Sequence, residues 1–241
     1  MNPNDLILSS SNWDEFFERV SALEEPKDKG DAFEKFTQIY LQTAPKYRLL
    51  LKNVWKPDQD FGIDFLARTR QDQLWSIQAK FRLDTDSALT YKELSTFKTL
   101  SDNSEDIDFC LVVHTSTKPI KNLHLLGENN STLGIDESES INHELWELIQ
   151  AAAKGEHKQL QPLTPRPHQQ QAVIDIKEYF LLPLRTHGRV SMSCGSGKSL
   201  VGFWSALELK AESTVVVVPS LYVISQSIWV WSREILANHV D

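Results

Sequence analysis

Three polar residues in the first third of the chain have the types and the spacing that phosphodiester hydrolysis requires. Residues 74–81 alternate apolar and polar side chains, which predicts a strand with Ser76, Gln78 and Lys80 on one face. The same alternation in residues 62–66 places Asp64 opposite the apolar face of its own strand. If the two strands are neighbours, a carboxylate, an amide and an ammonium converge. A carboxylate binds a hard divalent ion that activates water, and a lysine stabilises the developing charge.

A second group of residues has the composition of a phosphate-binding loop. It follows an expected strand, opens an expected helix and contains two glycines, Gly195 and Gly197. Glycines let backbone N–H groups wrap a phosphate, and the helix N-terminus favours an anion. Lys198 is expected to reach the β- and γ-phosphates of a nucleotide, and the Ser199 hydroxyl to bind Mg²⁺. The nucleotide-binding residues predicted in this loop are Gly195, Ser196, Gly197, Lys198 and Ser199.

Hydrophobic periodicity and helix-capping signals predict the elements that position these residues. We expect a charged loop at residues 24–30, helices at 13–23, 31–44, 91–100 and 141–154, and strands at 47–55, 62–68, 73–81 and 108–114. After residue 166 we expect helices at 167–181 and 198–210, strands at 189–193 and 214–218, and a final helix. That second alternation predicts the start of a doubly wound α/β sheet.

The length of 241 residues allows one large domain or two small ones. Residues 155–167 contain one glycine and three prolines among polar residues, which is typical of a linker. We therefore predict a first domain at residues 1–154, a linker at 155–165 and the start of a second domain at 166–241.

The composition excludes several classes of protein. With 41% hydrophobic and 24% charged residues, the chain is typical of a soluble globular protein. The longest aliphatic run, residues 215–218, is too short to span a membrane, so we expect a cytoplasmic protein without a membrane partner. Two cysteines disfavour a disulfide scaffold or a structural zinc site. The net charge of −8 disfavours nucleic acid, yet residues 44–100 carry 10 Lys/Arg against 7 Asp/Glu, so a local basic surface remains possible.

The first group of residues resembles the nuclease superfamily whose signature is an Asp, a spacer and then Glu/Gln-x-Lys. Asp64 with Gln78-Ala-Lys80 is similar to its Gln-x-Lys branch, the Mrr-like restriction nucleases. The resemblance implies an Mg²⁺-dependent DNA endonuclease with Asp64, Gln78 and Lys80 as catalytic residues. It further implies that Glu34, on a preceding helix, completes a metal site with Asp64 and Gln78. Because Gln78 replaces the commoner acid, the resemblance implies weaker metal binding, or metal held partly through the Ala79 carbonyl.

The second group resembles superfamily 2 helicases and translocases. Met192 stands where the general phosphate-loop pattern has its first glycine, which matches the shorter loop of that family. Residues 166–172 resemble its adenine-reading segment, which implies that Arg166 and Gln169 bind the nucleotide. Residues 216–221 resemble its DNA-contacting motif, which implies DNA contacts by Pro219, Ser220 and Gln226. The implied ligands are ATP and double-stranded DNA.

The order of the two resemblances is similar to the N-terminal half of single-polypeptide type I restriction enzymes. It implies a restriction-endonuclease-like α/β/α domain followed by a partial RecA-like (P-loop) α/β domain. Such a protein cuts foreign DNA in a bacterium with a nuclease coupled to an ATP-driven translocase. The sequence reaches residue 241 before an acidic magnesium motif or a second lobe, so we expect an incomplete ATPase and the remainder of the helicase outside this chain. Two alternatives stay open: an inactive nuclease-like module that docks DNA or protein, and a nucleotide-binding fragment.

Overall fold

The computed structural model describes residues 2–58, 62–104, 106–122, 128–135 and 141–238. It divides into two units, Met1–Lys158 and Gln159–Asp241. None of the described helices is both long and apolar enough to cross a membrane.

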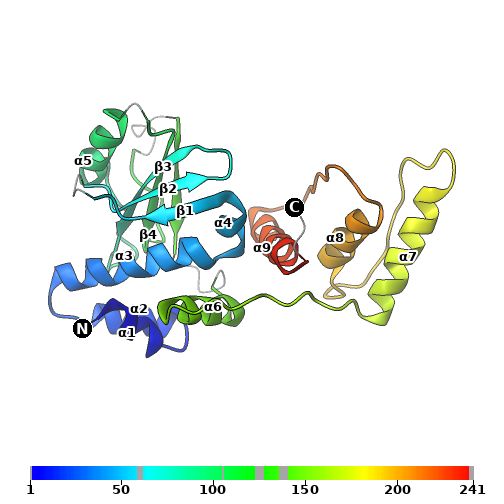
Figure 1. The fold of residues 1–241 in the computed structure, drawn as a ribbon, viewed down its shortest axis with the longest axis horizontal. Helices are drawn as coiled ribbons and strands as arrows, with labels where there is room; N and C mark the ends of the chain where they lie inside the picture. The colour runs from blue at the N-terminus through cyan, green and yellow to red at the C-terminus, as the bar shows by residue number, and fades with distance from the viewer. Residues whose placement is uncertain (1, 59–61, 105, 123–127, 136–140, 239–241) are drawn as a thin grey trace. The chain divides into compact units, whose positions relative to one another are not determined.

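A layer of helices packs on one face of the sheet in the first unit (Figure 1). The long α3 (Pro26–Thr43) lies against the strands, and α1 (Pro3–Leu8), α2 (Trp13–Ser21) and α6 (His143–Ala153) pack on α3. Asparagine side chains cap α1, α2 and α6, each accepting a backbone N–H bond in the first turn. The layer encloses completely or almost completely buried aromatic rings of Phe16, Phe33, Phe36 and Trp146.

The sheet has five strands in the order β1-β2-β3-β4-β5. They are β1 (Leu51–Trp55), β2 (Phe65–Thr69), β3 (Leu74–Lys80), β4 (Phe109–His114) and β5 (Asn130–Gly134). The β1–β2 and β2–β3 pairs are antiparallel, whereas β3–β4 and β4–β5 are parallel. On the second face, α5 (Tyr91–Asp102) packs Leu94 and Phe97 in one cluster with Cys110 and Val112 of β4. The expected α/β/α architecture is therefore confirmed.

Four local expectations in this unit were wrong or incomplete. Residues 45–50 form a short helix, α4 (Pro45–Leu50), because a proline is well suited to the first turn of a helix as well as to ending the previous one. For the same reason α3 begins at Pro26, inside the expected loop. The sequence pattern also missed α1 and β5. Finally, both faces of β3 are buried, with Ser76 as inaccessible as Ile77, because α3 covers one face and α5 approaches the other.

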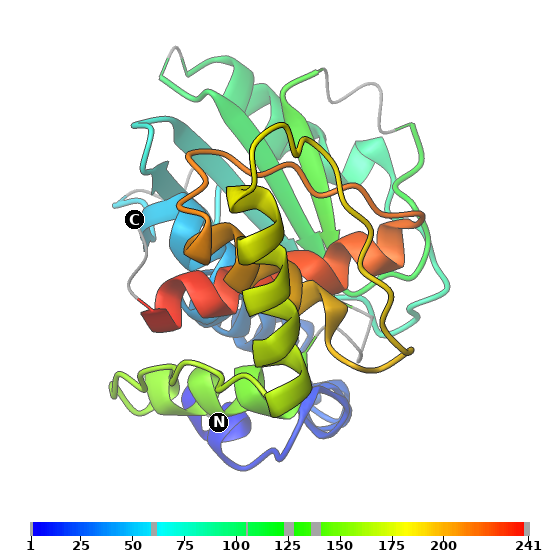
Figure 2. The ribbon, with the colours of Figure 1, turned by 90° about the vertical axis from the view of Figure 1, so that its right-hand side faces the viewer.

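The second unit contains α7 (Pro167–Leu181), α8 (Lys198–Glu208) and α9 (Leu221–Asn238). Figures 1 and 2 show α8 between α7 and α9, which agrees with the packing of α8 on both helices. The apolar contacts join Val173 of α7, Val201 and Phe203 of α8, and Trp231 of α9. The bounds of α7 agree with those expected, and α8 ends two residues before its expected end; the final helix was expected without bounds.

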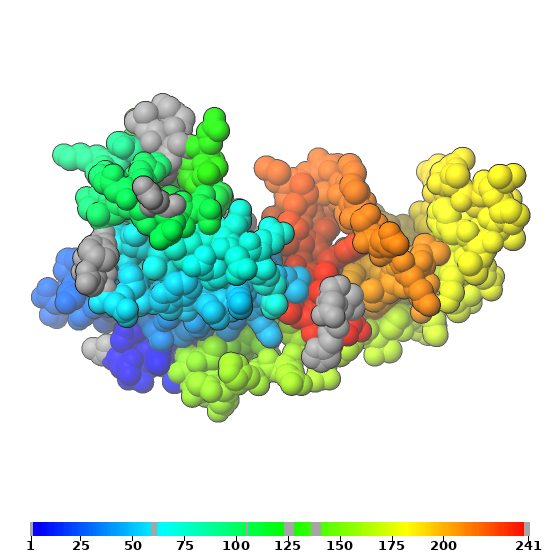
Figure 3. Space-filling view, turned by 45° about the horizontal axis from the view of Figure 1, so that its top comes forward, coloured from blue at the N-terminus to red at the C-terminus, as the bar shows by residue number. Residues whose placement is uncertain are grey.

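The two strands expected in the second unit are absent from its described residues. Residues 189–193 and 214–218 have no regular secondary structure and no strand pairing. A strand needs a neighbour to satisfy its backbone N–H and C=O groups, and no described segment pairs with either one. Val215 and Val217 are consequently 87% and 88% exposed. Figure 3 shows the orange segment around these residues at the surface of its unit.

Candidate active site and phosphate-binding loop

Glu34, Asp64, Gln78 and Lys80 line one cavity of about 360 Å³ in the first unit. The register between β2 and β3 pairs Phe65 with Ile77, which brings Asp64 beside Gln78. Gln78 and Lys80 share a face of β3 because they are two residues apart. Glu34 comes from α3, and Asp64 lies one residue before β2. The tertiary structure therefore joins four residues from three elements, and the sequence had singled out all four.

Asp64 is held at this cavity through one of its two oxygens. Its Oδ2 accepts the Gln78 Nε2–H at 2.5 Å and the Ala79 backbone N–H at 2.6 Å. The Asp64 backbone N–H donates to the Ile77 carbonyl at 3.1 Å. Among the described residues, no hydrogen bond engages Oδ1. One carboxylate oxygen is therefore fixed by the protein, and the other remains able to bind a cation.

Burial raises the pKa of Asp64 to about 6, and the nearby Glu34 carboxylate contributes to the rise. The hydrogen bonds from Ala79 and Gln78 and the charge of Lys80 oppose it. A bound cation would relieve this cost of burying a charge. Within the described part of the chain, no three His, Cys, Asp or Glu residues cluster as metal ligands. Two carboxylates and an amide oxygen nevertheless suit Mg²⁺, which usually keeps several of its waters.

Lys56 does not line the cavity, but it pairs with a residue that does, and the sequence analysis missed this contact. Its ammonium pairs with Glu34 Oε2 at 2.9 Å and lies 5.5 Å from the centre of the Phe65 ring. Lys56 and Glu34 are 22 residues apart, so no spacing rule connects them. The pair neutralises a carboxylate that the sequence assigned to a metal, and a cation at the site would compete with Lys56 for it.

The phosphate-binding loop has the backbone that its glycines predict. Gly195 and Gly197 adopt φ values of 73° and 81°, and Gly197 is the N-cap of α8. Lys198 Nζ donates to the Met192 and Ser193 carbonyls at 3.2 and 2.8 Å. The Ser196 hydroxyl also donates to the Ser193 carbonyl, at 2.7 Å. The loop thus curves tightly enough for its own lysine to bridge its carbonyls.

Gln169 holds this loop against α7. Its side chain is 4% exposed; Oε1 accepts the backbone N–H of Arg166 at 2.8 Å, and Nε2 donates to the Ser196 carbonyl at 2.9 Å. A Cβ at position 197 would lie 2.3 Å from Gln169 Nε2. Gly197 is therefore needed for close packing as well as for its φ angle. The amide expected to contact an adenine is occupied by the loop in this arrangement, and the Arg166 side chain is exposed.

Trp231 contacts Ser199, and the sequence analysis missed this contact as well. Its indole N–H donates to the Ser199 carbonyl at 3.0 Å and to the Ser199 Oγ at 3.1 Å. The bonds connect α9 to the first turn of α8. The serine expected to bind Mg²⁺ is therefore oriented by a tryptophan 32 residues further along the chain.

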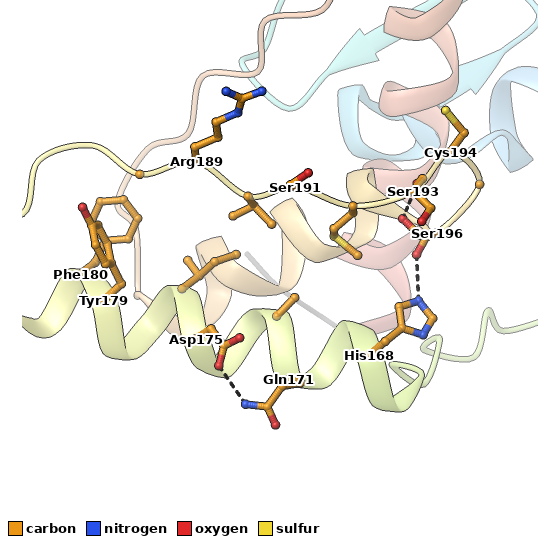
Figure 4. A pocket seen from close by; sticks show the side chains of 16 residues that line it. His168, Gln171, Asp175, Tyr179, Phe180, Arg189, Ser191, Ser193, Cys194 and Ser196 are labelled. Carbon is orange, nitrogen blue, oxygen red and sulfur yellow. Dashed lines mark hydrogen bonds between the residues drawn. The ribbon is translucent and has the colours of Figure 1, made fainter.

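A cavity of about 1010 Å³ extends from the loop along α7 (Figure 4). His168 and Ser196 lie at one end, joined by a contact of 3.3 Å between His168 Nε2 and the Ser196 carbonyl. Tyr179 and Phe180 lie at the other end. The predicted DNA-contacting residues Pro219, Ser220 and Gln226 do not line this cavity; they are exposed, before and within the first turns of α9.

Residues 27–147, which contain the first site, match an Mrr-type catalytic family described as restriction endonuclease. This match covers just over half of the chain. The chain belongs to the restriction endonuclease family. Residues 162–236 match the family of the type III restriction enzyme res subunit, so the restriction endonuclease domain is followed by a helicase-type domain. The two resemblances found in the sequence are confirmed.

A solved structure has the same fold over most of this restriction endonuclease chain. It is described as the ATP-dependent Type ISP restriction-modification enzyme LlaBIII bound to DNA. The two share 21% sequence identity with a TM-score of 0.70, over 90% of this chain and 15% of the other. The chain therefore spans about 15% of the length of that protein. No curated protein matches the sequence.

Proposed function

We propose that the restriction endonuclease domain hydrolyses phosphodiester bonds of double-stranded DNA with the help of Mg²⁺. The observation that carries this proposal is the convergence of Glu34, Asp64, Gln78 and Lys80 on one cavity. Family membership makes the same chemistry the natural expectation.

Each residue has a distinct role in the proposed reaction. Asp64 Oδ1 and Glu34 hold the metal, and Gln78 fixes the Asp64 carboxylate and offers its own amide oxygen as a further ligand. Lys80 places its ammonium beside the scissile phosphate and stabilises the charge that develops there. Bound Mg²⁺ supplies polarisation of the phosphate and a more acidic water. Ala79 contributes its backbone N–H, which holds Asp64 Oδ2 and would leave Oδ1 to bind a metal.

We further propose that the helicase-type domain binds ATP and contacts DNA. The loop N–H groups of residues 195–199 surround the phosphates, Lys198 exchanges its two carbonyl partners for phosphate oxygens, and Ser199 binds Mg²⁺. Arg166 and Gln169 contact the nucleotide, and Gln169 must release Ser196 to do so. Pro219, Ser220 and Gln226 contact the DNA backbone. In a restriction system these reactions take place in the cytoplasm.

Cleavage of supercoiled plasmid tests the nuclease assignment. Wild-type chain with Mg²⁺ or Mn²⁺ is compared with Lys80→Ala and with Lys154→Ala, which removes an exposed lysine at the C-cap of α6. We expect Lys80→Ala to lower the nicking rate on the order of 100-fold, the effect of removing one stabilising donor, while Lys154→Ala cuts like wild type. Equal cleavage by wild type and Lys80→Ala contradicts the assignment.

Two observations favour a second function, in which the domain docks on DNA without catalysis. Lys56 already neutralises Glu34, and Gln78 stands where a further acid would strengthen metal binding. A docking module predicts DNA affinity that survives Asp64→Ala, weakens with salt and is accompanied by no cleavage under any metal.

A further inference from the structure

Three cationic side chains line a second surface hollow in the first unit. The hollow has a volume of about 290 Å³ and lies beside β1, which is an edge strand of the sheet. Arg48 of α4, Lys52 of β1 and Arg70 just after β2 contribute the cations. The amides of Gln42 and Asn53 complete its polar lining, and no carboxylate is among the described residues that line it.

These three cations have no ion pair with any described carboxylate, in contrast to Lys56 on the same strand edge. For Arg48 and Lys52 the local sequence explains this, because residues 44–57 contain four Lys/Arg and no Asp/Glu. Arg70 is nevertheless positioned: its Nη2 donates to the Arg48 carbonyl at 3.2 Å, and its backbone N–H donates to the Leu50 carbonyl at 2.9 Å. Like charges gathered without a partner repel one another, and a bound anion removes that cost.

The hollow and the candidate active site are both lined by residues of α3. Gln42 of α3 lines the hollow and donates through Nε2 to the Val54 carbonyl of β1 at 3.1 Å. Glu34 precedes Gln42 by eight residues on α3, which is about 12 Å along a helix. In the space-filling view, residues of β1 and β2 form part of the outer surface of the unit (Figure 3).

We propose that this hollow binds a backbone phosphate of double-stranded DNA at a position separate from the cavity where the phosphate is cut. The proposal rests on the proposed nuclease function and adds to it the surface that orients the duplex. Two arginines and a lysine supply several N–H donors for phosphate oxygens, and the amides supply neutral ones. Contacts of this kind position DNA without reading its sequence.

The test measures affinity of the full chain for a fluorescent 25-base-pair duplex in EDTA, over a series of salt concentrations. We compare wild type with Lys52→Gln, Arg70→Gln and the control Lys154→Gln. Removing one phosphate contact should reduce the slope of log affinity against log salt by about 0.9, and the affinity on the order of fivefold to tenfold at about 0.1 M salt. Lys154→Gln should match wild type, although it changes the net charge equally.

Lys52→Gln is the sharper variant, because the Arg70 side chain also bonds the Arg48 backbone. Thermal melting of each variant identifies loss of folding. Competition experiments distinguish a simple anion site from a duplex site. If inorganic phosphate and single-stranded DNA both displace the labelled duplex less effectively than unlabelled duplex does, the proposal is supported. The proposal is overturned if Lys52→Gln and Arg70→Gln bind the duplex with the affinity and salt slope of wild type. It is also overturned if free phosphate competes as well as unlabelled duplex. Binding in EDTA requires no cleavage, so failure of the nuclease function alone leaves this result unchanged.

Discussion

In the proposed reaction, the metal chemistry of the first unit depends on Asp64. Two donors hold its Oδ2, while burial and the charge of Glu34 raise its pKa to about 6. The folded chain without metal therefore bears the cost of a buried charge whenever the pH is above that value. The same cost favours metal binding, because a cation compensates the charge that the protein leaves only partly stabilised.

Asp64→Asn should stabilise the metal-free chain at alkaline pH. In wild type the folded pKa exceeds the ordinary value of 3.8, so ionisation destabilises the fold above about pH 6, and this effect disappears below about pH 4. We expect Asp64→Asn in EDTA to unfold with a free energy larger by up to about 3 kcal/mol at pH 8, with the difference shrinking toward pH 4. Chemical denaturation at several pH values measures it.

Addition of Mg²⁺ at pH 8 provides the control for this variant. A metal that binds the folded site should raise the melting temperature of wild type and leave Asp64→Asn nearly unchanged. Identical stability of the two chains at pH 8 in EDTA would show that Asp64 bears no such cost.

At the scale of elements, α9 carries a buried charged pair that holds the first residues of the second unit. Arg233 and Glu234 form an ion pair, and Glu234 is completely buried. The Arg233 guanidinium donates to the Gln161 carbonyl at 2.8 Å, and Glu234 accepts the Leu163 backbone N–H at 3.2 Å. Residues that sequence alone assigns to a linker are therefore bonded to the last helix of their own unit.

Glu234→Ala should destabilise the second unit strongly. It removes the completely buried carboxylate that pairs with Arg233 and accepts the Leu163 backbone N–H, and breaking a buried ion pair typically costs about 3–5 kcal/mol. Near-UV circular dichroism during thermal unfolding monitors the change, with the exposed Glu212→Ala as the control. If both variants melt at the same temperature, the pair does not hold the segment.

At the scale of the whole molecule, the two candidate sites draw their residues from different units. The nuclease residues fall within Met1–Lys158 and the phosphate loop within Gln159–Asp241. Each unit has buried apolar clusters of its own. The chemistry of one site therefore requires no side chain from the other.

This separation predicts that two lysine substitutions each impair one activity and leave the other unchanged. Lys198→Ala should weaken binding of a fluorescent ATP analogue at least about tenfold, because a charged donor to phosphate is lost, and should leave plasmid nicking without ATP unchanged. Lys80→Ala should lower the nicking rate on the order of 100-fold and leave nucleotide binding unchanged. Loss of nicking in Lys198→Ala, in a variant that melts like wild type, would show that the sites depend on each other.

The sequence by itself determined the family, most elements and the four residues at the first site. Those conclusions rest on local signals: alternation in β3, capping residues of the helices, and glycines whose backbone the phosphate loop requires. Such signals involve residues close in the chain, so a linear pattern records them.

Only the tertiary structure decided which distant groups meet. Lys56 reaches Glu34, Trp231 reaches Ser199, and Gln169 bonds the loop, because packing of helices and strands brings them together across 22 to 32 residues. The strands expected at 189–193 and 214–218 do not form, because no described segment comes close enough to pair with them. A strand exists only when another segment pairs with its backbone, and an apolar run such as Thr214–Val218 cannot specify that partner.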